Sequence, residues 1–413
     1  MAFLFYFGRC IHAFALHYGS RFMVLLEKMY LYFDHMANTA PDPRVVDAMK
    51  DALLSIFGNP LSLHESGKKT DAAIEDARGK ISNLIGASPK EIIFTSCGSE
   101  SNNFAVRGLA KANAKKGKHI VTSTIEHFSV HYPLRDLEKE GFSVTYVPVD
   151  KFGMIDPAKV AGSMTPETIL VTLTHASNEI GTIEPISEIG KIVKEKGAVF
   201  HVDAVQTAGT IPLDVKELGA DAISFSSNQF YGPTGVAALY LKKGTRIIPF
   251  ILGGMQEDGK RGGTHNIAGI VGMGKACELA KQEMGSRIAN LIPLRDRLLQ
   301  GLGKNIKDII MTGHPEKRLP GHASCCIKFI EGESMSLFLD MEGIAVSTGS
   351  ACASKALKAS HVLLAIGIDA ENIHGSLVMS LGKDNSMQDV DMLLEKLPPI
   401  VERLRKLSPL GKK

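Results

Sequence analysis

FSSNQFYGPTG, residues 225–235, has the pattern of a buried strand that ends in a tight turn. The apolar and small residues before Ser227 are typical of a strand, and the Gly232-Pro233 pair is a strong turn signal. A strand end of this kind is a usual place for a reactive side chain to project into a cleft. The polar side chain at its centre is Gln229, whose carboxamide nitrogen is not nucleophilic.

Apolar runs and helical periods alternate along the chain on both sides of this stretch. Runs with the length and β-branched content of buried strands are predicted at Glu91–Thr95, His119–Thr122, Ser143–Val149, Ile169–Thr174, Val199–Val202 and Ala222–Ser226. Helices are predicted at Val45–Phe57, Asp71–Ile85, Glu100–Ala114, Val130–Glu140 and Ile186–Lys196. This alternation predicts an α/β fold with a large, mostly parallel sheet.

The last third of the chain has a different pattern. A long helical segment runs from Asn266 to Leu302, and shorter elements follow it. These are predicted at Ala323–Phe329, Ser334–Met341, Lys355–Ile366, Leu377–Ser380 and Met387–Leu407. We therefore predict a large domain over residues 29–290 and a smaller α+β domain over residues 291–413, with residues 29–45 packing on the smaller one.

Composition excludes some classes of function. A hydrophobic fraction of 44% and a charged fraction of 22% over 413 residues are typical of a soluble globular protein. A net charge of +3 is too small to indicate nucleic-acid binding. The six cysteines show no paired spacing, which predicts reduced thiols in the cytoplasm. The adjacent pair Cys325-Cys326 lies in a strand-like run and is expected to pack in the core on opposite faces.

Residues 1–28 are an extension of doubtful status. Their longest apolar run, Ala2 to Phe7, is far shorter than the roughly 18 residues of a membrane span, so no membrane association is predicted. The segment is poor in acids and carries arginine, as organellar transit peptides do, but it lacks their abundance of serine. A start assigned upstream of Met23 or Met29 explains the segment at least as well.

Three small-residue segments carry the candidate chemistry. In Thr95–Glu100, a strand followed by small residues and a helix would offer backbone amides and the Ser99 hydroxyl to a phosphate, although Ser99 could equally be an ordinary N-cap. In His201–Gln206, a buried strand ends in Asp203, which needs a partner such as a protonated ring nitrogen, or which caps a helix.

The third segment is Ser347–Cys352, a loop of small residues that ends in a cysteine just before a predicted helix. A thiol near a helix N-terminus on such a loop would have a depressed pKa and act as a nucleophile. Buried, inert cysteine is the commoner fate, though not usually inside a Gly/Ser loop.

As a set, these segments resemble one family. The chain is similar, from about Tyr30 to near Leu407, to the NifS/IscS-like cysteine desulfurases, which are pyridoxal-phosphate enzymes of fold type I. The matching stretches are Ile92–Ser96, Glu100–Asn103, Ile125–His127, Asn178–Thr182, Phe200–Asp203, Phe230–Pro233, Arg261–Asn266 and Ser347–Cys352.

The resemblance implies how each part of the cofactor is held. Asp203 would keep the pyridine nitrogen protonated, which makes the ring an electron sink, and His127 would stack on the ring and move protons. Gln206 and Asn178 would bind the ring hydroxyl and the substrate region. The phosphate would be held by Gly98, Ser99 and Ser226, with Thr264 reaching in from the second subunit of a homodimer. Capping or packing roles stay open for the last three hydroxyls.

The resemblance also implies a reaction. Cys352 would attack the sulfur of bound L-cysteine, keep it as a persulfide and release L-alanine, and an iron–sulfur scaffold or another sulfur acceptor would take the sulfur.

The chain departs from the family pattern in several places. Asn228-Gln229 stands where the family has His-Lys, so the amine that anchors the cofactor aldehyde is absent. Val378 stands where the family has an arginine for the substrate carboxylate. Further departures are His35 and Met36 in the N-terminal motif, Cys97 in place of Gly, and His265 in place of Glu.

Three interpretations follow from these departures. The chain is an impaired or inactive cysteine desulfurase that binds its cofactor non-covalently if it binds it at all. Alternatively, it is a catalytically dead dimeric scaffold or persulfide acceptor in sulfur transfer. A third interpretation is a pyridoxal-phosphate enzyme that uses another base.

Overall fold

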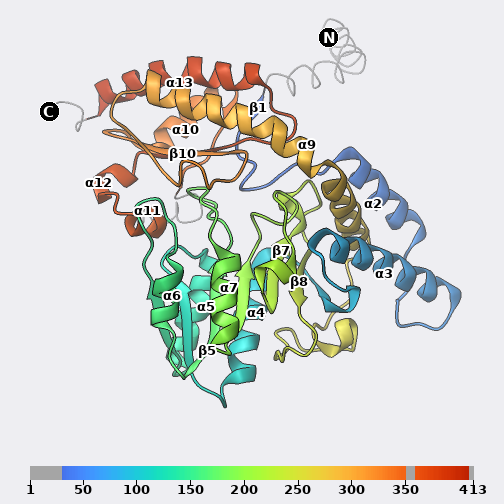
Figure 1. Cartoon of the computed structure of the whole chain (residues 1–413). Helices are drawn as coiled ribbons and strands as arrows, with labels where there is room; N and C mark the ends of the chain where they lie inside the picture. Colours follow the sequence, from blue (N-terminus) through green and yellow to red (C-terminus); the bar gives the residue numbers. More distant parts are fainter. Residues whose placement is uncertain (1–29, 350–358, 409–413) are drawn as a thin grey trace, which may run out of the picture.

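A computed structural model describes residues 30–349 and 359–408 of the chain (Figure 1). The predictions on residues 1–28 and on Cys352 fall outside these described ranges.

The larger sheet has seven strands in the order β2-β8-β7-β6-β5-β3-β4. Its strands are β2 (Ile92–Thr95), β3 (His119–Ser123), β4 (Ser143–Val147), β5 (Thr168–Thr174), β6 (Val199–Asp203), β7 (Ala222–Ser226) and β8 (Ala237–Leu241). β8 runs antiparallel to both of its neighbours, and the other pairs are parallel. The prediction of an α/β fold with a mostly parallel sheet is therefore confirmed.

Helices cover both faces of this sheet (Figure 1). They are α2 (Pro43–Ser55), α3 (Glu65–Ile85), α4 (Gly98–Asn113), α5 (Phe128–Lys139), α6 (Pro157–Ser163), α7 (Ile186–Glu195) and α8 (Val215–Leu218). Successive strand residues point to opposite faces, so Ile120 packs in the cluster with α4 and α5, while Val121 packs in the cluster with α3 and α7. Both strand faces are apolar because both are buried.

The C-terminal part contains the long helix α9 (Ile267–Asn305) and a second core (Figure 1). Its other elements are β1 (Leu31–Tyr32), β9 (Ile309–Met311), β10 (His322–Ile327), α10 (Gly332–Met341), β11 (Ile344–Ala345), α11 (His361–Ala365), α12 (Ala370–Ile373), β12 (Ser376–Ser380) and α13 (Met387–Leu407). β12, β10 and β9 form an antiparallel sheet, and β1 pairs in parallel with β11.

The N-terminal strand belongs to this second core. Phe33, which follows β1, is fully buried among residues of α9, α10 and α13. α9 contributes Met273 to the first cluster and Leu298 to the second, so the boundary predicted at residue 290 falls inside a continuous helix and stays a prediction.

Two local predictions have clear outcomes. Cys325 and Cys326 are both buried in β10, and they belong to the two different hydrophobic clusters, so the prediction of core packing on opposite faces is confirmed. Of the helix predicted at Lys355–Ile366, the described residues show α11 at His361–Ala365.

None of the helices in the described ranges combines the length and the hydropathy needed to cross a bilayer.

A buried charged group fastens a 3-10 turn at Gln256–Gly259 to the sheet. The Glu257 carboxylate accepts hydrogen bonds from Arg78 Nη1 at 2.8 Å, His265 Nε2 at 2.7 Å and the backbone N–H of Phe94 at 3.0 Å. Although burial alone would raise the pKa of Glu257, the bonds from His265 and Arg78 lower it to about 2. His265, which departs from the family pattern, thus helps to hold this carboxylate.

We expect Glu257→Gln to lower the free energy of unfolding by about 3 kcal/mol at pH 7, because the largely buried Arg78 guanidinium would keep only the exposed Glu75 as a charged partner. Urea unfolding followed by circular dichroism measures this change. Glu342→Gln is the matched control, since its ion pair with Lys396 is exposed and should contribute less than about 1 kcal/mol. Equal losses in the two variants would contradict the prediction.

Candidate functional site

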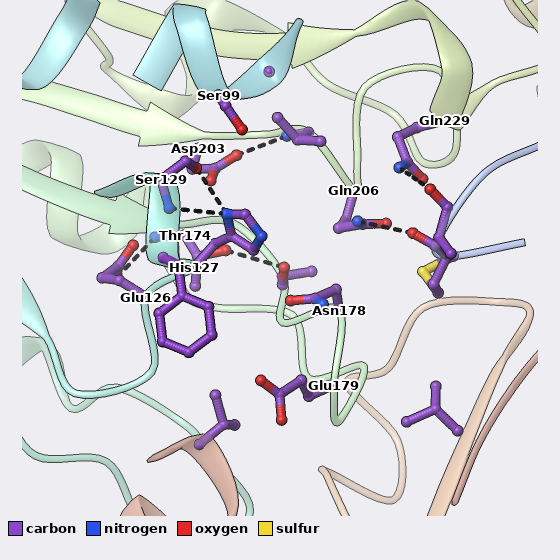
Figure 2. Close-up of a pocket in the computed structure, with 18 of the residues that line it drawn as sticks. Ser99, Glu126, His127, Ser129, Thr174, Asn178, Glu179, Asp203, Gln206 and Gln229 are labelled. Atoms are coloured by element: carbon purple, nitrogen blue, oxygen red, sulfur yellow. Dashed lines mark hydrogen bonds between the residues drawn. The ribbon is translucent and has the colours of Figure 1, made fainter. Parts of the chain in front are cut away.

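A pocket lies where β5, β6 and β7 end and where α4 and α5 begin (Figure 2). Thr174, Asp203 and Ser226 are the last residues of these three strands, and all three line the pocket. Residues 347–349, 360–362 and Val378 contribute from the C-terminal part. The site therefore sits at the carboxyl ends of parallel strands, as is usual for open α/β sheets.

Asp203 is the centre of a hydrogen-bond chain at one end of the pocket. Its Oδ2 accepts from Asn102 Nδ2 at 2.7 Å, and its Oδ1 accepts from the backbone N–H of Val205 at 3.0 Å. Burial raises the pKa of Asp203, and the nearby His127 opposes that rise. The bond to Val205 caps a turn, and the described residues 204–214 that follow form no helix, so the alternative that Asp203 caps a helix is wrong. The carboxylate can still accept a further donor.

Asn102 links this carboxylate to His127 through Ser129. Its second N–H bond goes to Ser129 Oγ at 2.8 Å, and Ser129 Oγ lies 2.7 Å from His127 Nδ1. His127 is the N-cap of α5, and its Nδ1 accepts from the backbone N–H of Ser129. The neutral ring consequently carries its proton on Nε2.

The N-terminus of α4 forms another wall of the pocket. Gly98 is the first residue of α4, and a Cβ at this position would lie 2.8 Å from Val205 Cγ2, so the close approach requires glycine. Cys97, not Ser99, is the N-cap, and no side chain of the described residues caps this helix. The alternative that Ser99 is an ordinary N-cap is therefore wrong. Cys97 has an extended backbone and an exposed thiol, so its β-carbon causes no strain there.

The turn that contains Gln229 is clamped by the N-terminal loop. Thr39 Oγ1 donates to the backbone oxygen of Asn228 at 2.8 Å and accepts from the backbone N–H of Tyr231 at 2.8 Å. Tyr231 has a φ of 68°, and this double contact from Thr39 helps to hold that strained conformation. The side chain of Asn228 accepts from Ser226 Oγ at 2.6 Å, so the one proton of the Ser226 hydroxyl is used within the chain.

Gln229 and Gln206 bind neighbouring backbone carbonyls of the same loop (Figure 2). Gln206 Nε2 donates to Met36 O at 3.3 Å, and Gln229 Nε2 makes a long contact of 3.5 Å with Ala37 O. The carboxamide oxygen of each is buried without a hydrogen-bond partner among the described residues.

The described part of the pocket lining is acidic. Its described lining includes the carboxyls of Asp34, Glu126, Glu179 and Asp203, and no Lys or Arg. Burial raises the pKa of Asp34 to about 6, of Glu179 to about 7 and of Glu126 to about 8. Val378 is buried in β12 and also lines the pocket, so the apolar substitution falls at the site itself.

The structure brings nearly all predicted site residues together. Those that line the pocket are Gly98, Ser99, His127, Asn178, Asp203, Gln206, Ser226, Gln229 and Val378. Thr264 is exposed outside this pocket, and Cys352 lies outside the described residues. The roles assigned to these residues stay predictions.

Sequence reasoning missed several polar residues of the pocket, among them Asn102, Ser129 and Glu126. Asn102 lies three positions after Ser99 and so on the same face of α4, and Glu126 and Ser129 flank His127 in the sequence. The three-residue spacing from Ser99 could have predicted that Asn102 faces the pocket. The contacts of Glu126 could not be predicted in this way, because they depend on the neighbouring strands.

Comparisons with known proteins assign this chain to a family. The aminotransferase class-V model matches residues 31–393. The chain belongs to this family, among its NifS/IscS-like cysteine desulfurases. It is 50% identical over 382 residues to cysteine desulfurase IscS of Dictyoglomus turgidum, covering 92% of this chain and 97% of that protein.

Two further relatives agree. Cysteine desulfurase IscS 1 of Archaeoglobus fulgidus is 49% identical over 379 residues, covering 92% and 99% of the two chains. A solved NifS-like protein has a TM-score of 0.86 at 37% identity, covering 91% of this chain and all (100%) of that chain. Membership of the family implies pyridoxal phosphate as the cofactor.

The residues present fit part of that cofactor. The buried Asp203 carboxylate suits a protonated ring nitrogen, and the uncapped N-terminus of α4, with Ser99 and the close approach at Gly98, suits a phosphate. When bound, pyridoxal phosphate supplies an electron sink. Gln229 offers no amine to its aldehyde, and Val378 offers no charge to a substrate carboxylate.

These residues can orient a ring and hold a proton. The hydrogen-bond chain from Asp203 to His127 fixes both groups, and His127 Nε2 carries a transferable proton. What the described pocket lacks is an amine that can act as a nucleophile or as a strong base.

Two further buried carboxyls, those of Glu126 and Glu184, interact electrostatically with each other. Glu126 Oε1 accepts from Ser123 Oγ at 2.5 Å and from the Thr174 N–H at 3.1 Å, while Oε2 has no partner among the described residues. Burial raises the pKa of Glu126 to about 8, with a further contribution from the charge of Asp203. Burial also raises the pKa of Glu184 well above its usual value, and the charge of Glu126 adds to this.

We expect Glu126→Gln to gain stability relative to the wild type as the pH rises from 5 to 9. The folded protein holds the Glu126 proton up to about pH 8, whereas the unfolded chain releases it near pH 4.5, so this group makes the wild type less stable across that window. The difference in urea midpoint between the two proteins, measured at several pH values, should widen with pH. The exposed Glu138→Gln is the control, and an unchanging difference for Glu126→Gln would contradict the prediction.

Proposed function

We propose that this protein is a cysteine desulfurase family member that holds pyridoxal phosphate without a covalent link and converts L-cysteine to L-alanine slowly or not at all. The observation that carries the proposal is Gln229 at the lysine position, in a pocket whose described lining has no Lys or Arg.

The missing groups account for the expected loss of rate. A positioned general base contributes typically about 10²–10⁴-fold to a reaction rate, and the family's lysine is that base. An arginine holds a carboxylate with two parallel hydrogen bonds, and Val378 makes neither.

What the chain keeps suits a role in sulfur transfer. We propose a homodimer that contacts an iron–sulfur scaffold or another sulfur acceptor, with Cys352 as the residue that receives a persulfide. The four described cysteines are free thiols, which agrees with work in a reducing compartment such as the cytoplasm.

We expect little or no alanine from L-cysteine when the wild type is loaded with pyridoxal phosphate. Gln229→Lys should restore a borohydride-reducible lysine adduct, and Gln229→Lys with Val378→Arg should restore partial alanine release. Recovery stays partial because His35, Met36 and Cys97 still differ from the family pattern.

The same assay decides between the alternatives. Alanine release by the wild type at least as fast as that of Gln229→Lys with Val378→Arg would overturn the proposal in favour of an enzyme with another base. Full activity from Gln229→Lys alone would show that the other departures have no effect.

Exposed apolar side chains support the dimer. At the end of α2 and in the turn after it, Leu54 is 74% exposed, Phe57 is 79% exposed and Leu63 is 90% exposed. Large apolar side chains gathered on a surface mark protein contacts. A second subunit there would also explain why Thr264 lies outside the pocket of its own chain.

We expect light scattering after gel filtration to give twice the chain mass of 44.5 kDa. Phe57→Glu combined with Leu54→Glu should shift the protein towards the monomer, because charges in an apolar interface lose their hydration. Leu337→Glu, on the exposed face of α10, is the control and should stay dimeric. A wild-type monomer would contradict the dimer.

A further inference from the structure

The unpaired polar atoms of the pocket are mostly hydrogen-bond acceptors. Among its described lining, the buried atoms without a partner include Asn102 Oδ1, Gln206 Oε1 and Gln229 Oε1. His361 Nδ1 is a fourth, and it is an acceptor because Nε2 of the same neutral ring donates to Glu126 O. Each of these atoms lacks a donor, and a buried acceptor without one costs free energy.

The orientation of the two glutamine amides follows from the loop at residues 36–37. Both Nε2 groups face backbone carbonyls, of Met36 and of Ala37 (Figure 2). Turning either amide over would place oxygen against oxygen, so each carboxamide keeps its oxygen as the free group. The chain thus presents acceptors at both positions.

The charge of the described lining also favours a donor over an acceptor. Asp34 and Glu179 add carboxyls to a described lining without Lys or Arg. A cationic group is therefore favoured inside this pocket, and an additional acceptor is disfavoured.

We infer that the site selects the amine form of the cofactor, pyridoxamine 5'-phosphate, over the aldehyde form, and that Gln229 is a main determinant of the choice. This inference rests on the proposed function, because it concerns the same site. The two forms share the ring, the hydroxyl and the phosphate. They differ at one carbon, where the aldehyde oxygen only accepts and the ammonium group offers three donors.

The lysine of the family normally meets the cofactor at that carbon. With an amine there, an aldehyde is captured covalently, so the aldehyde form is favoured. With Gln229 there, the aldehyde gains no bond and its oxygen faces another acceptor, whereas an ammonium group can donate to Gln229 Oε1.

Isothermal titration calorimetry of the full chain at pH 7.5 tests the inference with three ligands that differ only at this carbon. These are pyridoxamine 5'-phosphate, pyridoxal 5'-phosphate and 4'-deoxypyridoxine 5'-phosphate, which carries a methyl group. We expect the amine to bind at least about ten-fold more tightly than either of the others. Borohydride reduction and peptide mapping identify any aldehyde bound to surface lysines, and that fraction is subtracted.

Variants assign the preference to one residue. Gln229→Leu, of similar volume and without an acceptor, should reduce the preference for the amine to within about three-fold of the methyl compound. Gln229→Glu should keep or increase it, and Gln229→Lys should reverse it in favour of the aldehyde. Gln388→Leu, at an exposed position of α13, is the matched control and should keep the wild-type order.

The outcomes separate this inference from the proposed function. If no ligand binds, cofactor binding itself is wrong, and both fail. If the aldehyde binds as tightly as the amine, the proposed function stands and this inference is overturned. If Gln229→Leu keeps the wild-type preference, the assignment to Gln229 is wrong.

Discussion

The arrangement of the pocket depends on one buried carboxylate, Asp203, at the end of β6. A charge in this position must be compensated, and Asn102 and the Val205 N–H do so within the chain. Asn102 donates one N–H to Asp203 and the other to Ser129, and these two bonds fix α4 relative to β6 and to the start of α5. The backbone N–H of Ser129 donates to His127 Nδ1, and this bond sets the orientation and the tautomer of the His127 ring. One end of the pocket is therefore organised by hydrogen bonds that need no lysine.

The opposite end is organised by the N-terminal loop. Thr39 holds the turn at residues 228–231, and the carbonyls of Met36 and Ala37 receive Gln206 and Gln229. The amide of Gln229 and the apolar side chain of Val378 both line the pocket and add no charge to it. The raised pKa values of Asp34 and Glu179 reflect burial without a compensating cation in the described lining. The uncharged side chains of Gln229 and Val378 are consistent with these raised pKa values.

Much of the fold could be predicted from residue patterns, because buried strands rich in Val and Ile differ clearly from amphipathic helices. β8 escaped prediction, since its Ala237-Ala238 start has low strand propensity and only the pairing with β2 and β7 makes it a strand. Asp203, His127 and Gln206 could be proposed from motifs. The link through Asn102 and Ser129 could not, because it joins residues 101 positions apart whose distance only the fold determines.

Several buried carboxyls in one pocket lower the stability of the empty protein. Glu126 lines the pocket and leaves one oxygen without a partner among the described residues, and Asp203 keeps room for another donor. A chain that served only as a scaffold would be more stable with these groups replaced by apolar residues of similar volume. A ligand that brings a ring N–H to Asp203 and donors to the free oxygens would recover part of that stability through binding. The described groups therefore favour a pocket that holds a ligand.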